Sequence, residues 1–240
     1  MNTKEIKLIN RLIENHSYQY ALNTIESIIS KGNDKEAFIF GIYLLHHIIL
    51  FDNYSQQDEE MAKNKLLYYY KSSSMIFGED PDYLFIIGFI MLTGSNLFNN
   101  RYYYTNYKKS LSSFMIQSSL KKQPYNTIFL WGSFFVKGDT ISSYIARYIY
   151  DSHHIINDFI SKWGVVAKYI IYEYLERDML IDKTGNAFTH TIIYLRLLYY
   201  RYFRHCPEVC VNGKSGKSIT LTSQTNGNTN TTDAKEKGKS

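Results

Sequence analysis

The sequence predicts an all-α protein in which antiparallel helical hairpins stack as a bundle or a short solenoid of about eleven helices. Three observations indicate this fold class. Apolar residues recur at helical spacing, capping residues precede most of these apolar segments, and glycine or proline follows them. The 23 tyrosines and many β-branched residues favour strands by propensity alone, but the helical spacing and the caps outweigh that preference.

The N-terminal region contains three expected helices. Residues 4–15 carry apolar side chains at helical spacing. A second helix lies between Ser17, a suitable N-cap, and Gly32, which is suited to a left-handed conformation after a helix end. Asp34 can cap the third helix, residues 35–51. This third segment is apolar nearly all round, so we expect it to be central.

Two clear start signals define the next helices. Ser55 followed by Asp58 is a variant of the capping box, which predicts a helix over residues 56–76. Asp80, followed by a proline, combines a capping carboxylate with the residue preferred at the first helical position. It predicts a helix over residues 81–93.

The remaining expected helices are each bounded by a capping residue, a glycine or a proline. Gly164 separates or bends two of them, and Pro207 ends the last. Their ranges are residues 107–122, 127–137, 139–150, 154–162, 165–178 and 189–205. With short connections between them, these helices are expected to pack as antiparallel neighbours.

The helices are expected to form one domain over residues 1–207, followed by a disordered polar tail over residues 208–240. Gly, Ser, Thr, Asn and Lys dominate that tail. It carries too little apolar surface to offset the entropy of ordering the chain.

Charge and composition narrow the classes of function. The net charge is +5, of which +3 falls in residues 211–240, so the body is nearly neutral. A nucleic-acid binder usually presents a concentrated basic field, so nucleic acid is a less favoured partner. The apolar stretches are too short to span a bilayer, and no secretory signal is evident. Two cysteines do not make a disulfide framework, and we expect a cytoplasmic location.

One region resembles a tetratricopeptide-type helix pair, over about residues 80–126. Its first helix reads Tyr-Leu-Phe-Ile-Ile-Gly-Phe-Ile over residues 83–90, with Gly88 where that family packs its two helices closely. Its second helix, residues 110–120, alternates small and apolar residues and is followed by Pro124. The loop between them is longer than in the family, and serine replaces most alanines. The resemblance implies a stack of helical hairpins and binding to another protein.

The chain is also similar in general character to immunity proteins that neutralise bacterial polymorphic toxins. The shared features are size, helix content and an aromatic-rich composition, with 16% Phe, Trp and Tyr. The resemblance implies a cognate toxin as the partner. The nearly neutral body departs from the acidic immunity proteins that cap basic nucleases.

Two runs of aromatic and basic residues are candidate binding surfaces. Tyr and Arg are typical of binding hot spots because they bury a large area while keeping polar groups. One run lies on the helix expected at residues 189–205. The other lies at the loop before residues 107–122, and its candidate binding residues are Arg101, Tyr102, Tyr103, Tyr104, Tyr107 and Lys108. The same residue types would also suit a single-stranded nucleic acid.

Residues that could carry chemistry do not converge in the sequence, and no catalytic, cofactor-binding or metal-binding residue is assigned. His154 and Asp158, next to His153, lie four residues apart on one helical face, where a carboxylate can orient an imidazole for acid–base catalysis. A hydrogen-bonded structural pair is the competing interpretation. The apolar helix at residues 35–51 contains His46 and His47, which are expected to be satisfied core residues.

The remaining candidates have ordinary structural interpretations. The acidic group Glu173, Glu176 and Asp178 could serve a hydrolase, but mixed charges on a helix usually face solvent. Residues 213–218 lack the glycine that a phosphate-binding loop requires. The histidine and cysteines at residues 205–210 do not have the spacing of a zinc site.

The sequence therefore predicts a non-catalytic protein-binding helical module, and more specifically an immunity protein that neutralises a toxin by occlusion. Two alternatives remain. One is a helical enzyme or effector with an acid–base site near His154 and Asp158. The other is a nucleic-acid binder that uses the aromatic–basic loop.

Overall fold

The computed structural model describes residues 1–51, 56–98 and 110–181, and these residues are helical with no strand. The elements are α1 Thr3–Glu14, α2 Tyr18–Ile29, α3 Lys35–Phe51, α4 Gln56–Phe77, α5 Pro81–Thr93, the 3₁₀ helix η1 Ser95–Phe98, α6 Leu111–Lys122, α7 Thr127–Phe135, α8 Ile141–Asp151, α9 His153–Ile170, the π-helical turn η3 Ile171–Leu175 and α10 Glu176–Ile181. The all-α prediction is confirmed for this part of the chain.

The predicted count of eleven helices is wrong. The described ranges contain nine helices, because α9, η3 and α10 follow one another without a break. The chain nevertheless turns sharply inside α9 at Gly164, which has φ 51° and ψ −124°. The helix predicted at residues 189–205, the domain end at 207 and the tail at 208–240 lie outside the described residues.

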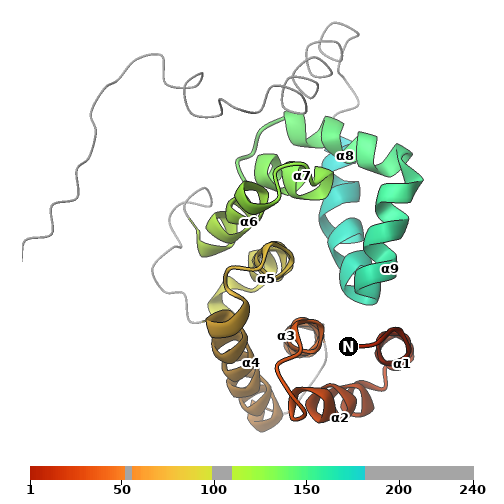
Figure 1. The fold of residues 1–240 in the computed structure, drawn as a ribbon. Helices are drawn as coiled ribbons and strands as arrows, with labels where there is room; N and C mark the ends of the chain where they lie inside the picture. The colour runs from red at the N-terminus through yellow and green to blue at the C-terminus, as the bar shows by residue number, and fades with distance from the viewer. Residues whose placement is uncertain (52–55, 99–109, 182–240) are drawn as a thin grey trace, which may run out of the picture.

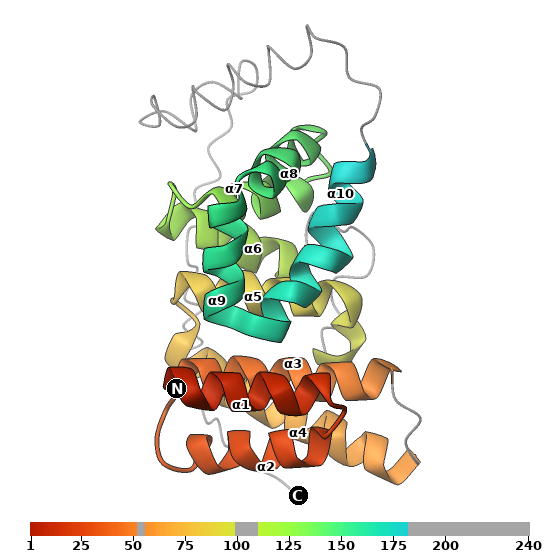
Figure 2. The same ribbon diagram turned by 90° about the vertical axis from the view of Figure 1, so that its right-hand side faces the viewer.

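Two groups of helices lie on opposite sides of α5. Figure 2 shows α1 to α4 together at one end of the molecule, with α6, α7, α8 and α10 beyond α5 at the other. In Figure 1 the chain follows an arc from α1 through α2, α4 and α5 to α8 and α9, and α3 lies inside the arc. The arc closes because α9 contacts both α1 and α5. Of the described helices, none is long and apolar enough to cross a membrane.

The core is built around α3 and α5. In α3, every residue from Ala37 to His46 is buried, and in α5 every residue from Tyr83 to Met91 is buried. A helix that is apolar on all sides needs neighbours on all sides. The central position expected for residues 35–51 is thus confirmed, and α5 takes the same role for the second group of helices.

Two glycines let helices approach α5 closely. A Cβ atom on Gly88 would lie 2.7 Å from Ile116 Cγ1 of α6, and one on Gly132 of α7 would lie 2.6 Å from Phe85 Cε2. At Gly132 the space is filled by Phe85 and Phe89, and Phe89 stacks on Trp131 with their ring centroids 5.1 Å apart. Gly88 thus lies at a close contact between α5 and α6.

Most predicted helix starts are seen in the structure, but not all. Asp80 caps α5 by accepting a hydrogen bond from the Tyr83 backbone N–H at 3.0 Å. Ser17 precedes α2 without a side-chain capping hydrogen bond, so that prediction is wrong. Gly32 is not left-handed either. Among the described residues, positive φ occurs at His16, Gly138 and Gly164.

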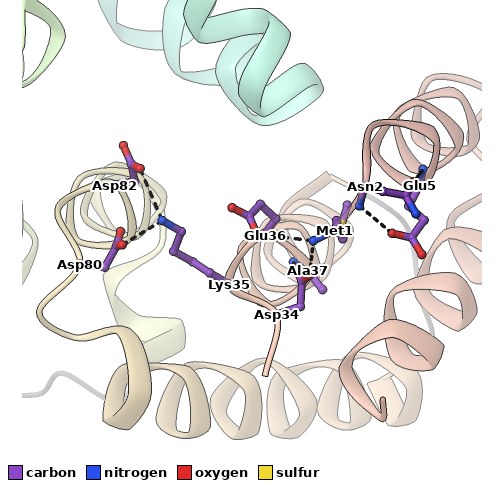
Figure 3. A network of polar contacts seen from close by, with 9 residues as sticks. All are labelled: Met1, Asn2, Glu5, Asp34, Lys35, Glu36, Ala37, Asp80 and Asp82. Atoms are coloured by element: carbon purple, nitrogen blue, oxygen red, sulfur yellow. Dashed lines mark hydrogen bonds and ion pairs between the residues drawn. The ribbon is translucent and has the colours of Figure 1, made fainter. Parts of the chain in front are cut away.

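An ion-pair network joins the starts of α3 and α5 to α9. Figure 3 shows the Lys35 side chain reaching from α3 to Asp80 and Asp82 at the start of α5. Lys35 Nζ lies 2.9 Å from Asp80 Oδ2 and 3.5 Å from Asp82 Oδ2. Asp82 also accepts a hydrogen bond from Lys162 Nζ of α9 at 2.7 Å. The network therefore links the two groups of helices at one edge.

A second polar cluster fixes the start of α1. The Met1 amino group forms ion pairs with Asp34 and Glu36 of the α3 start, as Figure 3 shows. The Asn2 side chain accepts hydrogen bonds from the first turn, and Glu5 accepts one from the Asn2 N–H at 2.8 Å. This reciprocal capping box fixes the first turn of α1, and the Met1 ion pairs join that turn to the start of α3.

Candidate binding groove

The binding residues predicted from the sequence cannot be placed, because they lie outside the described ranges. They are Arg101, Tyr102, Tyr103, Tyr104, Tyr107 and Lys108. The aromatic–basic run at residues 189–205 and the cysteines lie outside the described ranges as well. The site must therefore be sought among the described helices.

The acid–base candidates lie on one helix without a hydrogen bond between them. Both His154 and Asp158 are exposed on α9, and no hydrogen bond joins them. Asp158 lines a groove of about 320 Å³ together with Asp82 and Lys162, but His154 does not line it. The expected orientation of an imidazole by this carboxylate is thus absent from the described geometry.

The acidic group is divided between surface and core. Glu173 Oε2 lies 3.1 Å from Arg177 Nη2, and both side chains reach solvent. Asp178 is buried and accepts hydrogen bonds from Trp131 Nε1 at 2.9 Å and Ser142 Oγ at 3.0 Å. Burial raises the pKa of Asp178, and these two hydrogen bonds oppose the rise. The solvent-facing interpretation was therefore wrong for Asp178, which instead joins α10 to α7 and α8.

The described residues contain no group of three or more histidine, cysteine, aspartate or glutamate side chains placed to hold a metal ion.

A groove lined by aromatic rings lies where the α1–α2 corner, α3 and α9 meet. It has a volume of about 360 Å³, within the size range of ligand sites in proteins. Its lining residues are Ile13, Glu14, His16, Tyr18, Tyr43, His47, Val165, Lys168, Tyr169, Tyr172 and Glu173. Four tyrosines and two histidines from three separate segments therefore face one hollow.

The rings form a continuous wall. Tyr43 and Tyr169 have centroids 5.5 Å apart at 56°, and Tyr18 and His47 have centroids 5.9 Å apart at 72°. His47 also lies 5.9 Å from Tyr43 at 32°. Tilted and edge-to-face pairs of this kind stabilise a fixed arrangement. Tyr172 stands at the edge of the wall with 58% of its surface exposed.

His16 occupies an unusual backbone position in this groove. It ends α1 with φ 55°, while its N–H donates to the Ile13 carbonyl and the Ser17 N–H donates to the Leu12 carbonyl at 2.8 Å. These two bonds are the Schellman motif, in which glycine normally takes the left-handed position. Histidine there is strained. The strained backbone directs the imidazole to the Tyr18 hydroxyl, 2.7 Å from Nδ1.

A hydrogen-bonded chain joins the groove to the core. Tyr169 Oη lies 2.9 Å from Thr93 Oγ1, which lies 3.2 Å from His46 Nε2. His46 is completely buried, and burial lowers its pKa to about 4, with a smaller contribution from His47. The expectation of a satisfied core histidine is only half correct, because His46 Nδ1 has no hydrogen-bond partner in the described part of the chain.

Two of the tyrosines that line the groove, Tyr43 and Tyr169, are held as neutral phenols by burial. Burial raises the pKa of Tyr43 and Tyr169 above the ordinary value for tyrosine. Charge is confined to the rim, where Lys168 Nζ lies 2.7 Å from Glu14 Oε1. The rim also carries Glu173. The groove therefore combines an uncharged aromatic wall with charged groups at its mouth.

Comparisons with models of protein families, with curated proteins and with solved structures found no match for this chain.

Sequence reasoning missed this groove because its residues are spread over three distant segments. The histidines at 46 and 47 were noted only as core residues, and Tyr18 and Tyr172 drew no attention. One local signal was present. Asn-His-Ser at residues 15–17 ends a helix without the glycine that usually follows one. A helix end of this kind can place a side chain other than glycine in the left-handed conformation.

Proposed function

We propose that this protein is a non-catalytic binding module that holds a segment of a partner protein in the aromatic groove. The observation that carries the proposal is the convergence of Tyr18, Tyr43, Tyr169 and Tyr172 on one hollow, with His16 held beside them in a strained conformation. Tyrosines that keep a polar group while burying a large ring are typical of binding hot spots.

The surrounding fold supports a rigid docking surface. The groove walls belong to α1, α2, α3, α9 and η3, each of which buries residues in the core. Preorganised walls reduce the entropy lost when a partner binds. We also propose that the helices pair as stacked hairpins and that the protein acts in the cytoplasm, as the sequence leads us to expect. In its most specific form the partner is a toxin, which the protein neutralises by covering its working surface.

Comparison of two tyrosine variants by affinity capture from the native cell tests this proposal. Tyr172→Ala removes an exposed ring from the groove, whereas Tyr20→Ala removes a ring of which 71% is exposed on α2, outside the groove. We expect one partner protein to be retained by the wild type and by Tyr20→Ala. We expect Tyr172→Ala to lose at least about tenfold in affinity, because a truncated hot spot costs about 2 kcal/mol.

Purified components then decide the outcome. The partner should bind the wild type directly, and in the toxin form its activity should stop in the complex. A partner that binds Tyr172→Ala as tightly as the wild type would place the interface elsewhere and contradict the groove. A partner that remains fully active in the complex would contradict neutralisation while leaving binding intact.

The acid–base alternative has less support. Asp158 has polar neighbours in its own groove, but His154 is not among them.

A further inference from the structure

The aromatic groove described above offers a cation two kinds of attraction. The faces of tyrosine rings carry the negative part of the ring quadrupole, which attracts ammonium and guanidinium groups. Tyr43 and Tyr169 are tilted by 56° to each other, and Tyr18 and His47 by 72°, so the wall turns ring faces in several directions. The attraction is strongest where the cation loses water, as it would between the buried rings.

The charges that line the groove are unbalanced. Two carboxylates, Glu14 and Glu173, line it with one ammonium group, that of Lys168. Glu14 is paired with Lys168, so Glu173 is the carboxylate without a cation inside the lining. Its partner Arg177 lies outside the groove with 73% of its side chain exposed. Exposed ion pairs contribute little to stability, so Glu173 can exchange Arg177 for an incoming cation.

We infer that the groove binds an arginine side chain presented by a partner protein, with the guanidinium against the tyrosine wall and hydrogen-bonded to Glu173. Arginine fits better than lysine because its guanidinium is planar, weakly hydrated and able to stack on a ring while donating two hydrogen bonds to one carboxylate. This inference rests on the proposed function, since it names the chemistry by which the partner is recognised.

Three blocked or free compounds test the inference on the full chain. They are the peptide acetyl-Gly-Arg-Gly-amide, the same peptide with citrulline in place of arginine, and free L-arginine. Citrulline has nearly the shape of arginine but no charge. Binding is followed by ¹H–¹⁵N chemical shifts. We expect the arginine peptide to shift signals of residues 13–18, 43–47 and 165–173, and to bind about tenfold more tightly than the citrulline peptide.

Point variants separate the two attractions. Tyr172→Phe keeps the ring and should keep the binding, whereas Tyr172→Ala should weaken it. Glu173→Gln keeps the shape of the side chain and should reduce the preference for arginine over citrulline to the part that the ring faces supply. Tyr20→Ala, outside the groove, should bind the peptide as the wild type does.

Several results would overturn the inference. Equal binding of the arginine and citrulline peptides would show that charge is not recognised. Free L-arginine binding as tightly as the peptide would indicate a small-molecule site. Shifts that lie outside the groove, or no shifts at millimolar peptide, would also reject it. The proposed function fails separately, since it depends on whether Tyr172→Ala loses the captured partner, whatever that partner presents to the groove.

Discussion

At the scale of single residues, the groove and the core beneath it depend on side chains held in unfavourable states. His46 is buried without a hydrogen bond to Nδ1 in the described structure, and His16 holds a backbone conformation that suits glycine. Burial makes the folding free energy sensitive to pH through His46. The backbone conformation makes it sensitive to the residue at position 16.

Acidification should destabilise the protein through His46. Burial lowers the pKa of His46 to about 4, against about 6.5 in an unfolded chain. Between these values the unfolded chain binds more protons, so stability is complete above pH 6.5 and is lost as the pH falls. The expected loss is about 2 kcal/mol between pH 7 and pH 5, and about 3 kcal/mol by pH 4. Urea unfolding at each pH measures it.

The control for this prediction is a pair of glutamine variants. His46→Gln should remove this part of the pH dependence, whereas His154→Gln, on the exposed face of α9, should leave it unchanged. The comparison matters because Asp178 acts in the opposite direction. Its pKa is raised by burial, so acid favours its folded form. The same pH slope in wild type and His46→Gln would contradict the assignment.

The left-handed position of His16 predicts an unusual order of two variants. Alanine and glycine both remove the imidazole and its hydrogen bond to Tyr18, but only glycine adopts φ 55° without strain. His16→Gly should therefore be more stable than His16→Ala by about 1 kcal/mol. Chemical denaturation followed by circular dichroism measures the difference. If His16→Ala proved the more stable, the left-handed helix end would be refuted.

At the scale of elements, the turn inside α9 brings the second group of helices onto the first. Gly164 lies beside Asn10 of α1, whose Oδ1 accepts a hydrogen bond from the buried Val165 N–H at 3.1 Å. A Cβ atom on Gly164 would meet the Asn10 side chain 2.1 Å away. The first part of α9 ends at Gly164. The hydrogen bond between Asn10 and Val165 then holds the second part, which begins the groove wall at Val165, against α1.

Alanine substitutions at two glycines with positive φ, Gly138 and Gly164, should separate the cost of backbone strain from the cost of the contact with Asn10. Gly138 has φ 64° but open space around it, so Gly138→Ala should cost about 1 kcal/mol from backbone strain alone. Gly164→Ala should cost roughly 3 kcal/mol, because the methyl group also displaces Asn10 and leaves the Val165 N–H unpaired. Urea unfolding of both variants gives the comparison.

A double variant identifies the cause of the extra loss. In an Asn10→Ala background the methyl group added at position 164 no longer meets the Asn10 amide, so Gly164→Ala should cost nearer to the value for Gly138→Ala. Equal losses for the two glycines in the wild-type background would mean that the contact with Asn10 contributes nothing.

At the scale of the whole molecule, local signals predicted the helices and long-range contacts decided the rest. The starts of α5 and α7 are set by caps within a few residues, and the ranges predicted for them, from 81 and from 127, begin where these helices begin. Gly164 was recognised as a bend, but its role depends on Asn10, over 150 residues away. Asp178 was misjudged for the same reason, since its partners lie on α7 and α8.

The groove could not be predicted because no segment contains enough of it. Tyr18, Tyr43 and Tyr169 come together only when α2, α3 and α9 pack. The sequence predicted a binding surface rich in tyrosine and basic residues. It directed attention to residues 101–108, which lie outside the described ranges, and so the location stays a prediction there.

The π-helical turn η3 determines the direction in which the side chains of α10 point. Its wider loop, closed by the Glu176 N–H on the Ile171 carbonyl, accommodates one more residue than an α-helical turn. Excising one residue here would rewind the backbone into a regular spiral and rotate the downstream side chains by about 100°. The Asp178 carboxylate would then point away from the indole of Trp131. A regular α-helix could not place both Tyr172 at the groove and Asp178 beside Trp131. One wide turn thus lets a single stretch of helix place Tyr172 at the groove and Asp178 in the core.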